Sequence, residues 1–268
     1  MTRARRGTRG RLPAVLVAPA VLGLAFLVVP LAGLLVKAPW SDLPGQLLSA
    51  EVGQALRLSL VCATLATLLC LLLGVPLAWL LARGDLPGRG LLRALVTVPL
   101  VLPPVVGGVA LLLVLGRRGL IGQHLDAWFG ISLPFTTAGV VVAEAFVAMP
   151  FLVISVEGAL RGADPRYEEA AATLGASRWL TFRRVTLPSI LPGLVAGTVL
   201  CWARALGEFG ATITFAGNFP DRTTTMPLAV YLALETDPDA AIVLSIVLLI
   251  VSVVVLASLR DRWIGGAT

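Results

Sequence analysis

The sequence contains few side chains that could perform covalent or metal chemistry. His124 is the only histidine, which excludes any metal site that needs two, and Lys37 is the only lysine. A Walker A loop needs a Gly-Lys pair to hold phosphates, and Val36 precedes this lysine. The cysteines lie inside apolar runs, where small buried hydrophobic residues are expected rather than disulfides or metal ligands: Cys62, Cys70 and Cys201. We therefore predict no catalytic residue, no metal site and no cofactor in this chain, so another subunit would have to bind any ATP and Mg²⁺.

Apolar residues dominate the sequence. Of its 268 residues, 57% are hydrophobic and 13% are charged, and the mean hydropathy is +0.93. A soluble globular protein carries about 25% charged residues. This composition excludes a water-soluble enzyme, a disordered protein and a nucleic-acid-binding protein. The net charge of +6 comes from basic residues placed between long apolar runs, which indicates a lipid bilayer as the partner rather than a nucleic acid.

Six apolar segments are long enough to cross a bilayer. A hydrocarbon core about 30 Å thick needs about 20 residues of helix, because backbone polar groups cannot stay unpaired in lipid. The first segment exceeds the apolar core of a signal peptide and is expected to remain as an anchor. We predict an all-α fold, a polytopic membrane bundle in a single domain over residues 12–259. Its six transmembrane helices are expected near residues 12–36, 55–81, 94–115, 135–156, 190–215 and 240–259.

Basic residues are distributed unevenly on the two sides of these segments. Fifteen lie in the tails, residues 1–11 and 260–268, and in the loops after the second and fourth segments, whereas five lie on the opposite side. Cytoplasmic loops carry the excess of Lys and Arg. Both termini are therefore expected in the cytoplasm.

Residues 101–108 (VLPPVVGG) are the densest helix-breaking stretch within the apolar segments. Proline lacks a backbone N–H and disturbs the helical turn before it, which a membrane tolerates where neighbouring protein satisfies the freed carbonyl groups. The stretch predicts either a kink that fits helices together or a broken backbone that lines a path. Both interpretations remain open.

Arg204 and Glu208 are ionisable residues inside the fifth segment, four residues apart and therefore on one helix face. An ionisable group at membrane depth costs about 2.5–3.5 kcal/mol on insertion scales, which makes it a candidate for function. The pair either lines a path, with Arg204 offering positive potential to an anion, or forms an ion pair that holds helices together. The second interpretation is slightly favoured, because a transport path should hold its anion weakly. Glu144, in the fourth segment, is a further acid without a partner that the sequence identifies.

The longest polar stretch between the apolar segments covers residues 161–188. Asp164-Pro165 is a strong helix start, and the two glutamates and three alanines that follow favour a short helix. Gly175 suits the left-handed position that ends such a helix. An amphipathic stretch follows over residues 177–186. The pattern predicts two short helices on the cytoplasmic surface with a small Ala-rich face, which could cap the bundle or fit a partner's groove.

A fixed spacing runs through this loop: Glu-Ala-Ala at 169–171, three residues, Gly175, nine residues, then Val-Thr-Leu-Pro at 185–188. It resembles the EAA loop of ABC-importer permeases, E-A-A-x3-G-x9-I-x-L-P, with valine in place of the usual isoleucine. In that family the loop forms a coupling helix that docks in a groove of the ATP-binding subunit and passes ATP-driven closure to the membrane helices. By residue match the resemblance assigns ATPase coupling to Glu169, Ala170, Ala171 and Gly175, and the predicted coupling loop also includes Glu168, Leu187 and Pro188.

Further stretches resemble molybdate-type permeases within this family. They are residues 204–211 (RALGEFGA), 215–218 (FAGN), 222–231 (RTTTMPLAVY), 99–104 (PLVLPP) and 116–120 (GRRGL). The likeness extends over residues 55–259. It implies a homodimer in the bacterial cytoplasmic (plasma) membrane, cytoplasmic ATPase subunits that bind ATP and Mg²⁺, and an extracytoplasmic oxyanion-binding protein. The implied cargo is a tetrahedral oxyanion, molybdate first, with sulfate and tungstate as alternatives.

Polar residues at the outer end of the fifth segment complete the set of candidates. Asn218, Thr223 and Thr224 lie beside a basic residue and could receive an oxyanion, although a solvated loop is the simpler interpretation. With Arg204 and Glu208 they form the candidate translocation path or gate. An ion-coupled secondary transporter is one alternative to an importer, but it would need more buried ion-coordinating groups than this chain offers, and it leaves the EAA spacing unexplained. A membrane scaffold or assembly factor without a transport role is the other alternative.

Overall fold

The computed structural model describes residues 14–41, 45–46, 49–84 and 86–264, and these residues form helices without any strand. The predicted cytoplasmic tail 1–11 and the last four residues of the predicted tail 260–268 lie outside the described residues. The helices are α1 (Ala14–Lys37), α3 (Ala50–Arg83), α4 (Arg89–Val101), α5 (Pro104–Leu115), α6 (Gly122–Phe129), α7 (Thr137–Gly162), α8 (Arg166–Thr173), α9 (Arg178–Thr181), the π-helix η1 (Phe182–Thr186), α10 (Leu187–Leu206), α11 (Gly210–Phe215), α12 (Met226–Thr236) and α13 (Pro238–Ile264).

Among the described residues, five helical segments are long and apolar enough to cross a membrane. They are α1, α3, α7, the continuous run from α9 to α10, and α13. A sixth span results if the bent pair of α4 and α5 is counted as one. The prediction of an all-α membrane helix bundle is therefore confirmed.

The expected third segment is not one straight helix. Its residues are divided between α4 and α5, whose axes differ by 116° across the break at Leu102 and Pro103. Two consecutive prolines remove two N–H donors and clash with the preceding turn, so the helix ends before them. The expected fifth segment is also interrupted, because α10 ends at Leu206 and α11 begins at Gly210.

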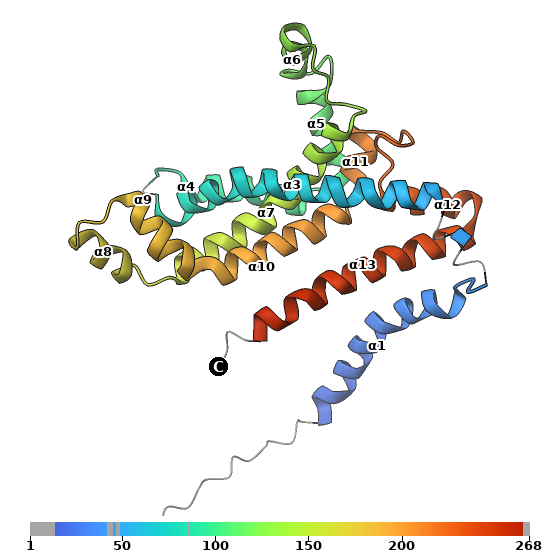
Figure 1. Cartoon of the computed structure of the whole chain (residues 1–268), viewed down its shortest axis with the longest axis horizontal. Coiled ribbons are helices and arrows are strands. Elements are labelled where there is room, and N and C mark those ends of the chain that lie inside the picture. Colours follow the sequence, from blue (N-terminus) through green and yellow to red (C-terminus); the bar gives the residue numbers. More distant parts are fainter. Residues whose placement is uncertain (1–13, 42–44, 47–48, 85, 265–268) are drawn as a thin grey trace, which may run out of the picture.

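The core lies where α7 packs between α3 and α10 (Figure 1). The facing residues are small on all three helices, including Ala66, Ala148 and Ala205, each of which is fully buried. On α10, a Cβ added to Gly193 would lie 2.5 Å from the Cβ of Ala159, so only glycine allows this approach. Lipid offers no hydrophobic drive for helices to associate, and small residues provide close packing instead.

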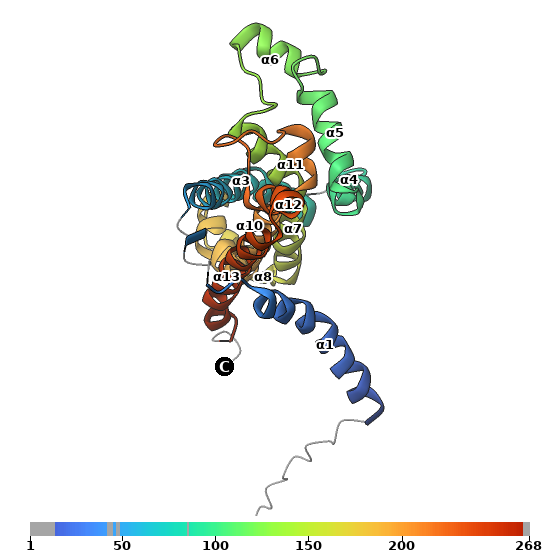
Figure 2. The ribbon, with the colours of Figure 1, turned by 90° about the vertical axis from the view of Figure 1, so that its right-hand side faces the viewer.

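The remaining elements extend from this core in different directions. Helices α8 and α9 lie at one end of the three-helix core, and α12 lies at the other (Figure 1). Helices α5 and α6 project to the side beyond the break (Figure 2). The later part of α1 lies near α13, and its start points away from the bundle (Figure 2). The side chains of α1 are mostly exposed in this single chain, so lipid or another protein must cover them.

Substitution of Gly193 by alanine tests the close packing of α7 and α10. Crowding against Ala159 should lower the free energy of unfolding by about 1–3 kcal/mol. Gly158→Ala is the matched control, because Gly158 is exposed on α7 with no atom within 4 Å of an added Cβ, and alanine there should stabilise by up to about 1 kcal/mol. Thermal unfolding of the purified protein in detergent measures both. Equal melting temperatures for the two variants would contradict the packing argument.

Candidate functional site

Helix α8, the first helix in the loop between α7 and α10, is capped at both ends. The carboxylate of Asp164 accepts a hydrogen bond from the backbone N–H of Arg166 (3.0 Å), which starts α8. At its other end Gly175 has φ +82°, and the N–H groups of Gly175 and Ala176 bond back to the carbonyls of Ala172 and Ala171. This is a Schellman turn, whose left-handed residue strongly favours glycine. The prediction of a short helix ending at Gly175 is confirmed.

The second half of the loop joins α8 directly to the bundle. The hydroxyl of Ser177 accepts a hydrogen bond from the N–H of Leu180 and caps α9, which runs into η1 and then α10 without a break. Phe182 packs edge-on against Trp79 of α3, with ring centroids 5.2 Å apart. Single-turn π-helices often occur at functional sites. This one lies where the loop enters the core.

The residues assigned to coupling differ in their exposure. Glu169, Ala170 and Gly175 are exposed on α8 and its terminal turn, whereas Ala171 is half-buried. Leu187 is half-buried and Pro188 exposed in the first turn of α10. Helix α8 contains no buried residue at all. Its outer face is therefore free to meet another protein.

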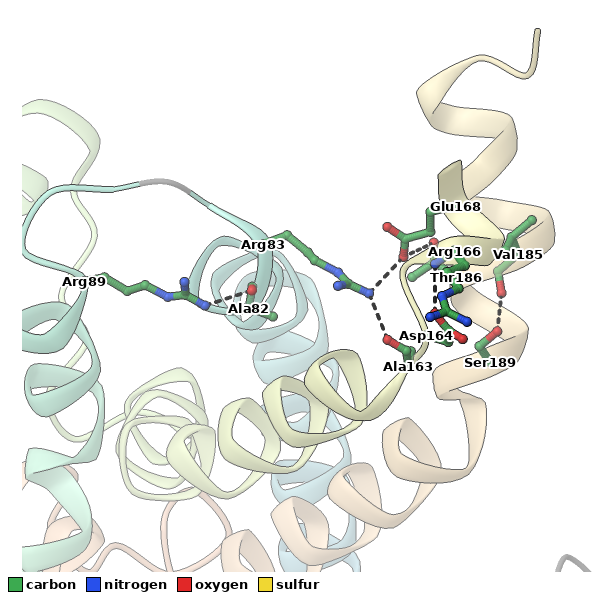
Figure 3. Close-up of polar contacts among 10 residues, drawn as sticks. All are labelled: Ala82, Arg83, Arg89, Ala163, Asp164, Arg166, Glu168, Val185, Thr186 and Ser189. Atoms are coloured by element: carbon green, nitrogen blue, oxygen red, sulfur yellow. Dashed lines mark hydrogen bonds and ion pairs between the residues drawn. The ribbon is translucent and has the colours of Figure 1, made fainter. Parts of the chain in front are cut away.

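Glu168 contacts Arg83 and Thr186 (Figure 3), whereas its neighbour Glu169 is exposed. The Oε1 atom of Glu168 lies 3.2 Å from Nη2 of Arg83, at the end of α3, and accepts a hydrogen bond from the hydroxyl of Thr186 (3.0 Å). The same Nη2 of Arg83 donates to the carbonyl oxygen of Ala163 (3.5 Å). The side chains of Arg83 and Glu168 are about three-quarters buried, and Thr186 is almost completely buried. This group ties α8 to α3, η1 and the end of α7.

A second carboxylate binds two arginines at the same end of the bundle. Glu157 of α7, which is almost fully buried, forms ion pairs with Arg93 of α4 and with Arg161 one turn further along α7. Arg161 also donates to the carbonyl oxygen of Leu81 on α3 (3.5 Å). Helices α3, α4 and α7 are thereby joined by charged groups near the loop.

Arg204 lies in the last turn of α10. Contrary to the prediction, Glu208 does not share a helix face with it, because α10 ends at Leu206 and Glu208 lies in the break before α11. Nη2 of Arg204 is 2.5 Å from Oε2 of Glu208, and Oε1 of Glu208 accepts a hydrogen bond from the N–H of Ala211 (2.8 Å). Glu208 is 1% exposed, and the Arg204 side chain is 26% exposed. Both carboxylate oxygens are engaged, one by the guanidinium and one by the first turn of α11.

The breaks in the two interrupted helices are in contact. A Cβ added to Gly210, the first residue of α11, would lie 2.9 Å from the Cβ of Pro104, the first residue of α5. A Cβ added to Gly108 would lie 2.9 Å from the carbonyl oxygen of Ala211. Irregular backbone at membrane depth occurs where it is buried in protein or lines a water-filled cavity. Here each break is partly covered by the other.

The candidate residues beyond α11 bond mainly within their own loop. The hydroxyl of Thr224 donates to the side-chain oxygen of Asn218 (2.7 Å), and the hydroxyl of Thr223 accepts from the N–H of Phe219 (2.8 Å). Asn218 and Thr224 line a cavity of about 590 Å³ between α3, α12 and α13. No hydrogen bond or ion pair among the described residues joins this loop to Arg204 or Glu208.

The charge of this cavity does not suit an anion. Among the described residues that line it, three carry carboxylates, Glu51, Asp221 and Asp237, and none is basic. Negative groups repel an oxyanion and leave it less stable than in water. The geometry therefore gives no support to oxyanion binding at Asn218 and Thr224 in this single chain.

Sequence reasoning missed several residues that the structure brings into the site. Arg83, Arg93 and Thr186 carried no signal, because a basic residue at the end of a span is ordinary and a threonine is not distinctive. Glu157 was overlooked as an acid near the end of an apolar segment. Glu144 was noted, and its Oε2 atom has no hydrogen-bond partner among the described residues, although it is almost fully buried.

Comparison with known proteins identifies relatives that cover nearly the whole chain. The chain is 49% identical over 253 residues to the molybdenum transport system permease protein ModB of Mycobacterium tuberculosis, covering 94% of this chain and 95% of that protein. It is 38% identical over 238 residues to the sulfate transport system permease protein CysT of Escherichia coli, covering 87% and 86% of the two chains.

The fold is shared with a solved ABC transporter. The structure of a bacterial alginate ABC transporter, in complex with its alginate pentasaccharide-bound periplasmic protein, contains a chain that superposes with a TM-score of 0.73. The match covers 93% of both chains at 20% sequence identity, so it shows the fold alone. A family profile described as binding-protein-dependent transport system inner membrane component matches residues 74–266. This chain belongs to that family of multi-pass inner-membrane transport components.

Proposed function

We propose that this chain is the membrane-spanning permease subunit of an ABC importer for a tetrahedral oxyanion, and that the oxyanion is molybdate. The observation that carries the proposal is the 49% identity to a molybdenum permease over nearly all of both chains. The sulfate permease is more distant, at 38%. Sulfate is therefore the second candidate, and tungstate, which is close to molybdate in size and charge, is the third.

The proposed assembly contains two copies of this chain, two cytoplasmic ATPase subunits and an extracytoplasmic binding protein, with both termini of the chain in the cytoplasm. ATP and Mg²⁺ would bind to the ATPase subunits, and this chain would catalyse no reaction. The exposed face of α8 supports the ATPase contact, because Glu169 and Ala170 are accessible and alanine lets another backbone approach closely.

The proposed mechanism is alternating access. Closure of the ATPase subunits would move the two coupling helices together, and the membrane helices would change from facing the cytoplasm to facing the binding protein. The cargo then passes from a tight site on the binding protein to a weak cavity, which requires only that its affinity differ between the two states. The broken backbone where α5 meets α11 supports a path along this face, completed by the second copy.

Uptake into vesicles tests the substrate. The chain is reconstituted with its ATPase and its binding protein, and labelled molybdate is supplied with ATP inside the vesicles. We expect ATP-dependent uptake that excess tungstate blocks and excess sulfate does not. Competition by sulfate would make the chain a sulfate permease, and a complete assembly without ATP-dependent uptake of any oxyanion would refute the importer.

Removal of the Glu169 carboxylate tests the coupling surface. Glu169→Ala should lower ATP-dependent uptake by about 10-fold or more, the effect of losing one charged hydrogen bond at a protein contact. Glu235→Ala is the matched control, since Glu235 is equally exposed on α12, at the opposite end of the bundle. Uptake that is equal in the two variants would mean that Glu169 does not contact the ATPase.

The Arg204–Glu208 pair is proposed to hold α10 to α11 rather than to bind the cargo. Arg204→Ala leaves a buried carboxylate without its partner and should lower the free energy of unfolding by about 3 kcal/mol. Adding Glu208→Gln removes that charge but keeps an oxygen that can accept from Ala211, so the double variant should recover both its melting temperature and its uptake. A double variant that folds normally but transports poorly would place Arg204 in the path instead.

A further inference from the structure

The two adjacent glutamates of the coupling helix point in different directions. Glu169 is exposed on the outer face of α8, whereas Glu168 turns toward the bundle and its side chain is 24% exposed. Its Oε1 atom receives both Nη2 of Arg83 (3.2 Å) and the hydroxyl of Thr186 (3.0 Å) (Figure 3). The family pattern quoted above includes Glu169 but not Glu168.

Helix α8 has few other ways to act on the membrane helices. None of its residues is buried, so no apolar side chain anchors it in the core. Its covalent connections are a three-residue link to α7, residues 163–165, and the turn at Gly175. Among its described side chains, Glu168 alone forms an ion pair or hydrogen bond with α3 or η1.

The position of Arg83 makes this contact a direct route into the core. Arg83 is the last residue of α3, which packs along α7 and against α10. Hydrogen bonds between charged groups are about twice as strong as neutral ones, so a carboxylate that moves tends to move its guanidinium partner with it. Thr186 extends the same contact to η1 and the start of α10.

We propose that Glu168 is a positioning residue that transmits the movement of the coupling helix to α3 through Arg83 and to α10 through Thr186. This inference rests on the proposed function, because it assumes that an ATPase moves α8. Glu169 would contact the ATPase, and Glu168 would carry the resulting movement to the membrane helices. Without the Glu168 carboxylate, we therefore expect the ATPase subunits to stay bound and to hydrolyse ATP, but with less transport for each ATP.

The test uses the complete transporter reconstituted in vesicles, with Glu168→Gln, Arg83→Gln and the double variant. Both the oxyanion taken up and the ATP hydrolysed are measured, and their ratio is the readout. We expect each single variant to retain its ATPase subunits and basal ATPase activity but to transport about 10-fold less per ATP, the effect of losing one charge-assisted hydrogen bond. The double variant should be no worse than either single one, because both remove the same contact.

Arg117→Gln provides the matched control. Arg117 forms an ion pair with Asp126 of similar length, 3.0 Å, on the side of the molecule that carries α6. Removing it should leave the ratio of uptake to hydrolysis unchanged, which separates transmission from a general loss of ion pairs. Should Glu168→Gln fail to fold, Arg83→Gln alone gives the readout, since it leaves α8 unaltered.

Three results would overturn the inference. The first is a wild-type ratio in Glu168→Gln, and the second is losses in the two single variants that add together in the double variant. The third is release of the ATPase by Glu168→Gln, which would make Glu168 a docking residue. Failure of the proposed function is distinguishable, because the unaltered transporter would then show no ATP-dependent uptake.

Discussion

The structure depends on the close approach of α7 to α3 and α10. Helices in lipid gain nothing from apolar burial against one another, so they must come near enough for dispersion and for short polar contacts. Alanine and glycine on all three helices allow this, and Ser155 of α7 adds a hydrogen bond to the carbonyl oxygen of Gly193 (3.0 Å). The loop that carries α8 starts at the end of α7 and returns through η1 into α10. Its two ends are therefore fixed by the packing of the same two helices.

The interrupted helices also keep their polar groups paired and lie close to their neighbours, although their backbone is irregular. At the ends of α4 and α10 the last N–H groups still bond back into the helix, from Leu102 to Val98 and from Gly207 to Ala203. The N–H of Ala211 donates a hydrogen bond to the carboxylate of Glu208. The guanidinium of Arg204 in turn neutralises the charge of Glu208. This ion pair accounts for an arginine at membrane depth without a bound anion. Glycine at 210 then brings α11 against Pro104.

Features set by neighbours along the chain could be predicted from the sequence, and features set by distant neighbours could not. Helix α8 could be predicted from Asp164 before its start and from the left-handed Gly175 after its end, which are within a dozen residues of each other. Their spacing of four residues predicted the ion pair of Arg204 with Glu208, but it did not predict that Glu208 lies beyond the end of α10, in the break before α11. The contact of Arg83 with Glu168 joins residues 85 positions apart, and only the packing of α3 on α7 brings them together. The proline pair indicated a disturbed helix, but the 116° angle depends on what α5 packs against.

The polar contacts that join helices differ in kind between the two ends of the bundle. At the end that carries α8 they are mostly charged, those of Arg83, Arg93 and Arg161, whose side chains are all partly exposed. At the other end, beside the ion pair of Arg204 with Glu208, the contact of α3 with α12 is neutral, because the hydroxyl of Ser59 accepts from the N–H of Met226. Dissolved salt screens charges that lie farther apart than about 8 Å at physiological strength, and it weakens close, partly buried pairs much less. The charged contacts at the α8 end should therefore keep most of their strength over the range of salt concentration found in a cell, so the solution that bathes this end does little to change its stiffness.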